Sequence, residues 1–423
     1  MKWQDEVVIT GVGVVAPCGI GVESFWNALL SGRSGIDRLS IAADASLPVT
    51  IGGQVREFNP GEYVRPRKRL KLMCREMQTG CAAASLAVSD AGLENSQVHP
   101  ERMGVVFGGE IYYGPVEEAA EAYRGCIVDG EMKSEMWGET FTGKLNPLYM
   151  LRTLPNMCAC HIAIGHDARG PCNTIVSGDV SSLLAVIEAA RLIERGVADV
   201  VIAGGSGTRL NTLRMVKHDL DDVAQHADDP TSASRPFDAR RNGAVLGEGA
   251  AAIVLESRRH AQQRNADILA RLSGSHTCFV PNSAANGVAI RGIQRSIAGS
   301  MQKGRIDANN LGHVNAHGTS MVASDRIEAQ AIHASLGNTP VTAPKSYFGC
   351  LGAGTGAVEL AVSVLAVTKG VVPATLNYQQ PDPDCPVNVI CGDPMETRKR
   401  SALVLNQTSF GQFASVLVVA NDD

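Results

Sequence analysis

Residues 170–196, GPCNTIVSGDVSSLLAVIEAARLIERG, place a short apolar run, a glycine-containing turn and a periodic apolar segment one after another. This order predicts a strand, a sharp turn and a helix, a layout that exposes one side chain at a helix N-terminus. The exposed residue is Asp179. A cysteine there would be activated as a thiolate, because a helix N-terminus stabilises an anion. A carboxylate occupies the position instead, so the turn lacks the sulfur nucleophile that its layout favours.

Strand-like and helical segments alternate on both sides of this turn. The alternation predicts an α/β protein with buried sheets. Glycine-flanked loops lead into an apolar helix at 177–182 and again at 349–357, which indicates an internal duplication. Apolar residues recur at helical spacing in 75–92, 181–196 and 356–370. The strand-like runs are 6–15, 104–109, 173–178, 198–205, 250–256, 266–274, 313–318, 401–409 and 414–420.

Length and composition bound the class of protein. A chain of 423 residues is long enough for a large core in two fused halves. The net charge of -5 gives no electrostatic reason to expect nucleic acid or an anionic membrane as a partner. The chain contains no apolar run of membrane-spanning length and begins directly in a strand-like segment, so neither a membrane span nor a signal peptide is expected. Eleven cysteines without framework spacing favour a reducing compartment, so a cytoplasmic location is expected.

No metal and no cofactor is expected. Cys158 and Cys160 have no second pair of ligands nearby, which argues against zinc. Residues 11–16, GVGVVA, match a variant of the dinucleotide-binding fingerprint. However, Pro17 follows where the phosphate-binding helix should continue, and no strand ending in an acidic residue stands at the required distance. Tight packing explains these glycines better than a bound dinucleotide.

Three positions carry groups capable of chemistry. They are Asp179 at the turn, His317 after a short strand, and a glycine-rich loop with Lys345, Cys350 and Glu359. Each has a structural explanation when taken alone: aspartate is a good helix N-cap, a histidine after a strand is commonly a hydrogen-bonded structural group, and free cysteines are often core residues. Their combination in one chain favours a functional site.

In combination these segments resemble the β-ketoacyl-acyl-carrier-protein synthases, which are condensing enzymes of the thiolase fold. The resemblance covers nearly the whole chain and implies an α/β, thiolase-like fold. Two pseudo-duplicated halves, 1–257 and 258–423, are expected to form an αβαβα layered sandwich. The motifs that carry the resemblance are VVITGVGVVAPCG (7–19), GVADVVIAGG (196–205), SRPFDARRNGAVLGEGAA (234–251), NAHGTS (315–320), KSYFGCLGAGTGAVE (345–359), VVPATLN (371–377) and TSFGQFASV (408–416).

The resemblance also implies roles for single residues. In the family, a cysteine at the elbow takes the acyl chain as a thioester. Two histidines promote decarboxylation of malonyl-carrier protein and stabilise the enolate and the thioester oxyanion. On this chain the elbow cysteine falls on Asp179, the first histidine on His317, the family's lysine on Lys345 and the second histidine on Cys350. The histidine and the lysine are therefore retained, and two positions depart from the pattern.

Positions around this centre follow the family's pattern only in part. Thr319 matches a threonine that contacts the pantetheine arm, whereas the second such threonine is Met321. The gating loop, usually Phe-Gly-Phe-Gly-Gly, begins Phe410-Gly411-Gln412 here, so we expect reduced flexibility and no dependable oxyanion role. Two acidic residues are expected to support the centre from behind, Asp325 and Glu359.

The first hypothesis is a protein that has lost the condensing reaction. A carboxylate is a poor acyl acceptor from a thioester because the mixed anhydride lies uphill. The chain is then a β-ketoacyl synthase-like protein of fatty acid or polyketide-type biosynthesis, comparable to a chain-length factor that shapes the acyl tunnel of an active synthase. Its expected partners are an acyl carrier protein with a phosphopantetheine-bound chain and a second subunit, in a homodimer or in a heterodimer with an active ketosynthase.

The second hypothesis redistributes the catalytic roles. Cys350 would be the nucleophile, His317 its base and Asp179 the group that orients the imidazole. Lys345 would either hold Asp179 or Glu359 ionised or lower the thiol pKa. Such a site would be an acyltransferase or a thioesterase acting on a carrier protein. In a variant of this hypothesis His317 only stabilises an enolate, and the protein decarboxylates malonyl-carrier protein. A third hypothesis is a module that merely binds a carrier protein or a lipid.

Overall fold

Ten strands at the centre of the molecule fall into two sets of five that repeat one pattern. The computed structural model describes residues 6–40, 47–93, 98–114, 116–217, 220–225, 227–281 and 286–421. In each set the first strand along the chain pairs antiparallel with the fifth, and the fifth pairs antiparallel with the fourth. The fourth strand pairs parallel with the second, and the second pairs parallel with the third. The N-terminal set is β1 (Val7–Ala16), β5 (Met103–Gly108), β8 (Cys172–Ile175), β9 (Val200–Thr208) and β10 (Glu248–Ser257); the C-terminal set is β11 (Ala270–Phe279), β12 (His313–Asn315), β13 (Pro340–Thr342), β17 (Ser401–Gln407) and β18 (Gln412–Ala420).

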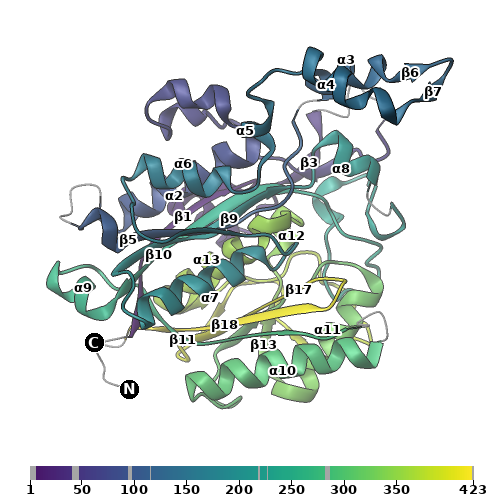
Figure 1. The fold of residues 1–423 in the computed structure, drawn as a ribbon. Coiled ribbons are helices and arrows are strands. Elements are labelled where there is room, and N and C mark those ends of the chain that lie inside the picture. The colour runs from purple at the N-terminus through teal and green to yellow at the C-terminus, as the bar shows by residue number, and fades with distance from the viewer. Residues whose placement is uncertain are drawn as a thin grey trace.

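Helices cover and separate these sets in five layers (Figure 1). α7 (Ser181–Glu194) and α13 (Thr355–Lys369) lie between the two halves of the sheet, and their apolar residues form one core with strands of both sets. α2 (Arg75–Asp90) and α6 (Met157–Gly165) cover the outer face of the N-terminal set. α10 (Asn286–Gly304) and α11 (Val322–Leu336) cover the outer face of the C-terminal set. The expected αβαβα sandwich of two repeated halves is confirmed, while the exact boundary at 257/258 stays a prediction.

Together with β2 (Gly19–Ile20) beside β1 and β15 (Asn388–Val389) beside β13, the two sets join into one twelve-stranded sheet. The junction is an antiparallel contact between β1 and β11, where Val8 pairs with Arg271 and Ile9 with Ala270. At the other end of the N-terminal set, β8 is the last strand of the sheet and pairs only with β5 among the described residues. β8 therefore presents an open edge.

The glycines of the sequence 11–16 lie inside strand β1 and not in a turn. A side-chain carbon on Gly11 would come within 2.3 Å of the Ala87 carbonyl oxygen, and one on Gly13 within 2.0 Å of the Ala83 carbonyl oxygen. Both oxygens belong to α2, which packs directly on the strand. Close strand–helix contact is thus the physical reason for these two glycines.

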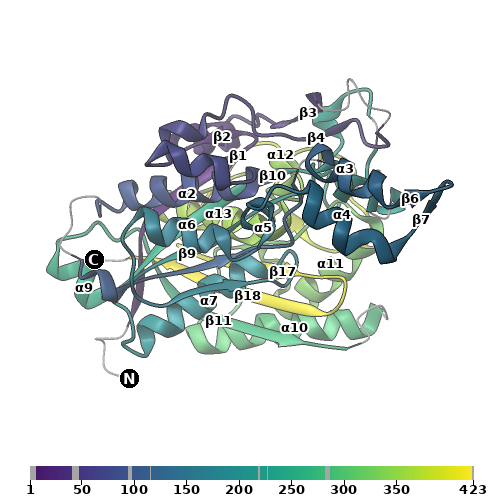
Figure 2. The ribbon, with the colours of Figure 1, turned by 45° about the horizontal axis from the view of Figure 1, so that its top comes forward.

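An arm formed by residues between β5 and β8 projects from the layers in both views (Figures 1 and 2). It contains α3 (Val116–Gly125), the hairpin β6 (Ile127–Val128) and β7 (Glu131–Met132), and α4 (Trp137–Lys144). Aromatic rings hold it together, with Trp137 4.8 Å from Tyr123 and 4.7 Å from Phe141 between ring centroids.

The remaining elements are short and connect the layers. Across the ranges described above, none of the helices is long and apolar enough to cross a membrane, and there is no cluster of metal-binding side chains. The short connecting elements are β2 (Gly19–Ile20), α1 (Val22–Leu30), β3 (Ile36–Arg38), β4 (Ile51–Gly53), α5 (Tyr149–Thr153), α8 (Thr212–Lys217), α9 (Arg258–Gln263), α12 (Lys345–Phe348), β14 (Val371–Val372), β15 (Asn388–Val389) and β16 (Met395–Glu396).

Candidate functional site

The predicted elbow is present between β8 and α7. Gly178 has a φ of +59°, a conformation that glycine adopts without strain, and it turns the chain into the helix. The Ser181 hydroxyl accepts a hydrogen bond from the Ser177 N–H at 2.8 Å and donates one to the Gly178 carbonyl at 2.6 Å. Val180 is the N-cap residue of α7, and no side chain caps this end. Asp179 is therefore placed at the elbow without serving as a helix cap.

Asp179 is held by an arginine that the sequence did not point to. Its Oδ1 accepts a hydrogen bond from Arg209 Nη2 at 2.6 Å. Burial raises the pKa of Asp179, but the opposing effects of the cations Arg209 and Lys345 prevail and hold it below its usual value. The elbow group is consequently a paired carboxylate at neutral pH, which is a weak nucleophile toward a thioester.

The ion pair continues away from the elbow through two more charged side chains. Arg209 follows β9 directly, and its Nη1 lies 3.5 Å from Oε2 of Glu110, which follows β5. Arg214 on α8 approaches the same Oε2 with Nη1 at 3.0 Å. We call Asp179, Arg209, Glu110 and Arg214 the charge ladder. Polar residues near the ends of the buried runs at 104–109 and 198–205 were the available sequence signal for Glu110, which follows its run directly, and for Arg209, four residues beyond its run. Functional side chains commonly follow strand ends.

His317 lies on the loop after β12 and is fixed by its backbone and its ring. Its N–H donates to Glu328 Oε1 at 2.7 Å, and the Gly318 N–H donates to Glu328 Oε2 at 2.8 Å. The ring Nδ1 lies 3.1 Å from Lys345 Nζ. An ammonium group has only donors, so Nδ1 accepts and the ring proton lies on Nε2. Burial and then Lys345 hold the pKa of His317 well below its usual value against the attraction of Asp179, so the ring is neutral.

Lys345 connects His317 to a buried acid. Besides the ring, its ammonium donates to the His317 carbonyl and to Glu359 Oε1. The other oxygen of Glu359 accepts from Asn406 Nδ2 at 3.0 Å. Burial raises the pKa of Glu359 to about 8 although Lys345 opposes the shift. The predicted neighbourhood of His317, Lys345 and Glu359 is thus a fully buried, hydrogen-bonded set in which all three ammonium protons are used.

Cys350 is close to these groups in electrostatic terms but is not joined to them. Its N–H donates to the Val245 carbonyl at 2.8 Å, and its carbonyl accepts from the Gly247 N–H at 2.9 Å. Burial raises the pKa of the thiol to about 12, although Lys345 opposes this. No hydrogen bond joins the Cys350 sulfur to His317 or Asp179 in the part of the chain that the structure describes. A thiol with these properties is not poised as a thiolate nucleophile.

Asp325 organises the loop that carries the predicted pantetheine contacts. Its carboxylate accepts hydrogen bonds from the Thr319 N–H at 2.8 Å, the Ser320 N–H at 3.1 Å and the Phe237 N–H at 2.9 Å. The Thr319 hydroxyl also donates to it at 3.2 Å. Met321 is the half-buried N-cap residue of α11. Asp325 was predicted to support the centre, and in the structure its carboxylate fixes the loop that carries Thr319.

In the predicted gating loop, Phe410 lies beside the elbow, whereas the Gln412 side chain is bonded to β11. A side-chain carbon added to Gly178 would lie 3.5 Å from ring atoms of Phe410, which is 56% exposed. Gly411 has a φ of +98°. Gln412 donates to Thr277 Oγ1 at 2.7 Å and is thereby tied to β11. Phe410 is thus beside the elbow, whereas the Gln412 side chain is not available to it.

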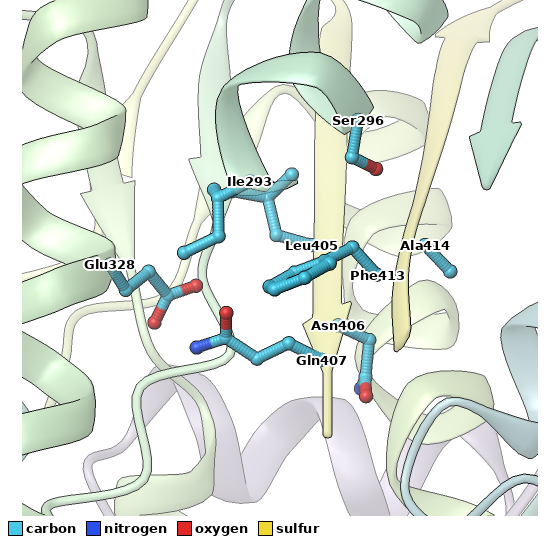
Figure 3. A pocket seen from close by; sticks show the side chains of 8 residues that line it. All are labelled: Ile293, Ser296, Glu328, Leu405, Asn406, Gln407, Phe413 and Ala414. Carbon is cyan, nitrogen blue, oxygen red and sulfur yellow. The ribbon is translucent and has the colours of Figure 1, made fainter. Parts of the chain in front are cut away.

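A small cavity lies behind the His317 loop between α10, α11 and the strands β17 and β18 (Figure 3). Glu328 and Gln407 face each other across it, and Phe413 closes one side (Figure 3). Its volume of about 10 Å³ is close to that of a single water-sized probe, so it holds no part of an acyl substrate. Burial raises the pKa of Glu328 to about 7. Glu328 was not predicted from the sequence, and its part is to position the backbone of His317.

Comparison with known proteins identifies the family. Residues 4–261 match the N-terminal domain of β-ketoacyl synthase and residues 273–379 match the C-terminal domain. The chain belongs to the β-ketoacyl synthase family. It is 32% identical over 435 residues to the tetracenomycin polyketide synthase ketoacyl synthase alpha subunit of Streptomyces glaucescens, covering 99% of this chain and 97% of that protein. It is also 32% identical over 417 residues to 3-oxoacyl-acyl-carrier-protein synthase 2 of Coxiella burnetii, covering 96% of this chain and 95% of that one.

Solved structures agree with this assignment. A ketosynthase described as bound to its type II polyketide synthase acyl-carrier protein superposes with a TM-score of 0.80 at 27% identity, over 99% of both chains. The ishigamide ketosynthase/chain length factor superposes with a TM-score of 0.85 over 99% of both chains, and its 24% identity supports the fold alone. This β-ketoacyl synthase family member therefore has the ketosynthase fold over its full described length, as the sequence motifs predicted.

Proposed function

We propose that this β-ketoacyl synthase family member does not itself condense acyl thioesters and acts as a chain-length-factor-like subunit beside an active ketosynthase. The observation that carries the proposal is the Asp179–Arg209 ion pair at the elbow, where relatives of the family are expected to have their cysteine. A paired carboxylate does not take an acyl group from a thioester. Without the covalent step, the subunit contributes the shape of the acyl tunnel and its contacts with the active ketosynthase.

The hypothesis that Cys350 acts as a nucleophile is less well supported than the chain-length-factor-like role. A base for Cys350 needs a free ring nitrogen, but Nδ1 of His317 accepts from Lys345 and Nε2 carries the proton. The raised thiol pKa of Cys350, about 12, works in the same direction. The acyltransferase and thioesterase hypotheses depend on both groups, so they stay predictions without geometric support.

An open sheet edge supports a two-subunit particle. On β8, Cys172 and Asn173 are exposed, and Val176 just beyond the strand is 52% exposed. On neighbouring elements Ile111 is 61% exposed and Ile164 on α6 is 69% exposed. Exposed apolar side chains beside an unpaired strand edge favour addition of a strand from a second subunit. The same surface serves a homodimer or a heterodimer with an active ketosynthase.

A basic segment supports an anionic partner such as a carrier protein with its phosphopantetheine phosphate. Residues 65–71, RPRKRLK, carry five cations in a chain whose net charge is -5. Arg65, Arg67, Lys68 and Lys71 are exposed. A cluster of one sign steers a partner of the opposite sign toward it. We expect Lys68→Glu together with Lys71→Glu to weaken carrier-protein binding several-fold at low salt and much less at high salt.

The test of the main proposal is a reconstitution. The purified chain is incubated with malonyl- and acyl-carrier protein, alone and together with a cysteine-bearing ketosynthase of the same organism, and products are identified by mass spectrometry. We expect no elongation by the chain alone, a stable complex of the two subunits, and longer products from the complex than from the ketosynthase alone. Elongation by the isolated chain, or an acyl adduct on Asp179, would contradict the proposal.

One observation favours a second candidate, decarboxylation of malonyl-carrier protein. The Nε2–H of a neutral His317 is a fixed donor, and such a donor stabilises the enolate oxygen that forms when the bond to the carboxyl carbon breaks and carbon dioxide leaves. Protonation of the enolate from water completes the conversion to acetyl-carrier protein. If this activity exists, it is lost in His317→Ala and retained in Cys350→Ala; an equal rate in His317→Ala would exclude this role.

A further inference from the structure

The charge ladder runs from the elbow to the wall of a separate cleft. That cleft has a volume of about 540 Å³. Thr208 and Leu210, the neighbours of Arg209 in the chain, both line it. Tyr113 lines it as well, and the guanidinium carbon of Arg214 lies 5.2 Å from the centre of the Tyr113 ring. The first member of the ladder thus stands at the elbow, and the last lies against Tyr113 in the wall of the cleft.

The ladder is fitted tightly into the protein. The side chains of Arg209, Glu110 and Arg214 are 16%, 6% and 11% exposed. A side-chain carbon on Gly207 would lie 2.6 Å from Glu110 Oε1, and one on Gly352 would lie 2.5 Å from it. Both contacts are shorter than real side-chain carbons allow, so the carboxyl is seated where two glycines leave room. Gly352 also belongs to the loop just after Cys350, which brings Glu110 close to the elbow centre.

Two atoms of the ladder have no hydrogen-bond partner in the described part of the chain, Oε1 of Glu110 and Nε of Arg214. Glu110 is buried, and its Oε1 makes no hydrogen bond among the described residues. On the cleft side, Oε1 of the buried Glu76 also makes none there, and Glu76 lines the cleft. An aliphatic chain passing from the elbow to the cleft would have to displace these buried carboxyl and guanidinium groups from their places, and it has no polar group to replace their partners.

We propose that Arg209 and Glu110 determine the specificity of the elbow site by filling the space between the elbow and this cleft, so that the site admits a short acyl group and excludes a medium or long one. The proposal deepens the proposed function, because it states what the non-condensing subunit keeps out of its own elbow. It predicts that returning a cysteine to position 179 is not enough to restore acylation by a long chain.

The experiment compares two acyl donors on an introduced cysteine. In Asp179→Cys, the thiolate attacks the carbonyl of acetyl- or octanoyl-N-acetylcysteamine, the new thioester bond forms, and N-acetylcysteamine leaves as the thiol after taking a proton. The adduct is followed by intact-protein mass spectrometry. We expect acetylation to be at least tenfold faster than octanoylation in Asp179→Cys. In Asp179→Cys with Arg209→Ala and Glu110→Ala, we expect this preference to fall at least tenfold because the space is no longer filled.

Matched variants keep the result interpretable. Asp179→Cys with Arg191→Ala removes an exposed arginine of α7 that lies outside the ladder, and its preference should stay as in Asp179→Cys. If the alanine variant does not fold, Arg209→Met with Glu110→Gln removes both charges while keeping the side-chain lengths. Equal rates for the two donors in Asp179→Cys would overturn the proposal, and so would an unchanged preference after both charges are removed. Elongation by the unmutated chain would contradict the proposed function but not this filling of the space.

Discussion

The two repeats use one strand order to hold different kinds of site. In the N-terminal repeat the residues after the second, third and fourth strands include Glu110, Asp179 and Arg209, which pair with one another. In the C-terminal repeat the corresponding loops carry His317, Lys345 and the segment before Phe410. His317 and Lys345 are joined by a hydrogen bond. In the described part of the chain no hydrogen bond joins the three N-terminal side chains to the side chain of His317 or Lys345, although their charges interact.

Under the proposed function, this difference corresponds to a site that has lost one step of the reaction and kept the groups for another. The C-terminal set still fixes a neutral imidazole with a defined proton on Nε2, which is useful toward a developing oxyanion. In the N-terminal set the charged side chains form ion pairs within the set, and none of them serves as a nucleophile. Three variants and one labelling experiment test this difference between the two sets.

The largest effect is expected for Lys345→Met in the C-terminal set. The change leaves the His317 carbonyl, the His317 ring and Glu359 without their shared donor in a buried place. We expect a loss of about 3–5 kcal/mol in the free energy of unfolding, measured with urea. Lys369→Met, at an exposed position, is the control and should change it by less than about 0.5 kcal/mol. A similar small loss for Lys345→Met would show that the C-terminal set is not held by this ammonium.

Arg209→Met should cost about 2 kcal/mol, less than Lys345→Met, because Arg214 still pairs with Glu110. The cost has a defined pH dependence. Arg209 lowers the folded-state pKa of Asp179 below 3.8, so its stabilisation is present above that value and is lost as the pH falls through the lowered pKa. The difference between the wild type and Arg209→Met should therefore be full at pH 7 and shrink below pH 4. A difference that grows in acid would refute the ion pair.

Glu76→Gln should change the pH slope of stability more than stability itself. Burial raises the folded-state pKa of Glu76 from 4.5 to about 7. Between these values the unfolded chain releases the proton and the folded protein keeps it, so stability falls as the pH rises from 4.5 to 7. The variant lacks this term, and we expect its decline over that range to be smaller by on the order of 1 kcal/mol. Glu62→Gln, at an exposed residue, should leave the slope unchanged.

The smallest effect is expected at Cys350, whose thiol should not react. With a pKa of about 12, only about one thiol in ten thousand is ionised at pH 8. Iodoacetamide at that pH should label the exposed Cys391 and leave Cys350 unmodified in peptide mapping. Rapid labelling of Cys350 would support the hypothesis that Cys350 is a nucleophile, and it would contradict the difference described between the two repeats.

Much of the fold could be predicted from the sequence because the long strands are continuous apolar runs. The expected runs at 6–15, 198–205 and 250–256 coincide with β1, β9 and β10 to within a few residues. The strand β13 was missed because it has only three residues. The helix α10 was missed because it contains glycines that lower helix propensity; Gly292 and Gly299 are there because the rings of Phe413 and His276 pack directly on them.

The site was predictable only as far as its motifs reach. His317, Lys345 and Glu359 lie together, and each belongs to a long motif. Arg209 and Glu110 belong to no such motif, and their pairing depends on how β5, β8 and β9 lie side by side. Spacing along the chain does not reveal which strand ends are neighbours, so a salt bridge between residues 30 positions apart or more could not be anticipated.

The single apolar core that α7 and α13 share with both strand sets has a consequence for how the molecule can be taken apart. Either repeat expressed alone would expose the inner faces of its strands and of one helix to water. The two repeats therefore share one architecture, but neither is expected to fold on its own. Heat or denaturant should melt both repeats in one cooperative transition, and a protease cut between them should leave a nicked but still associated particle.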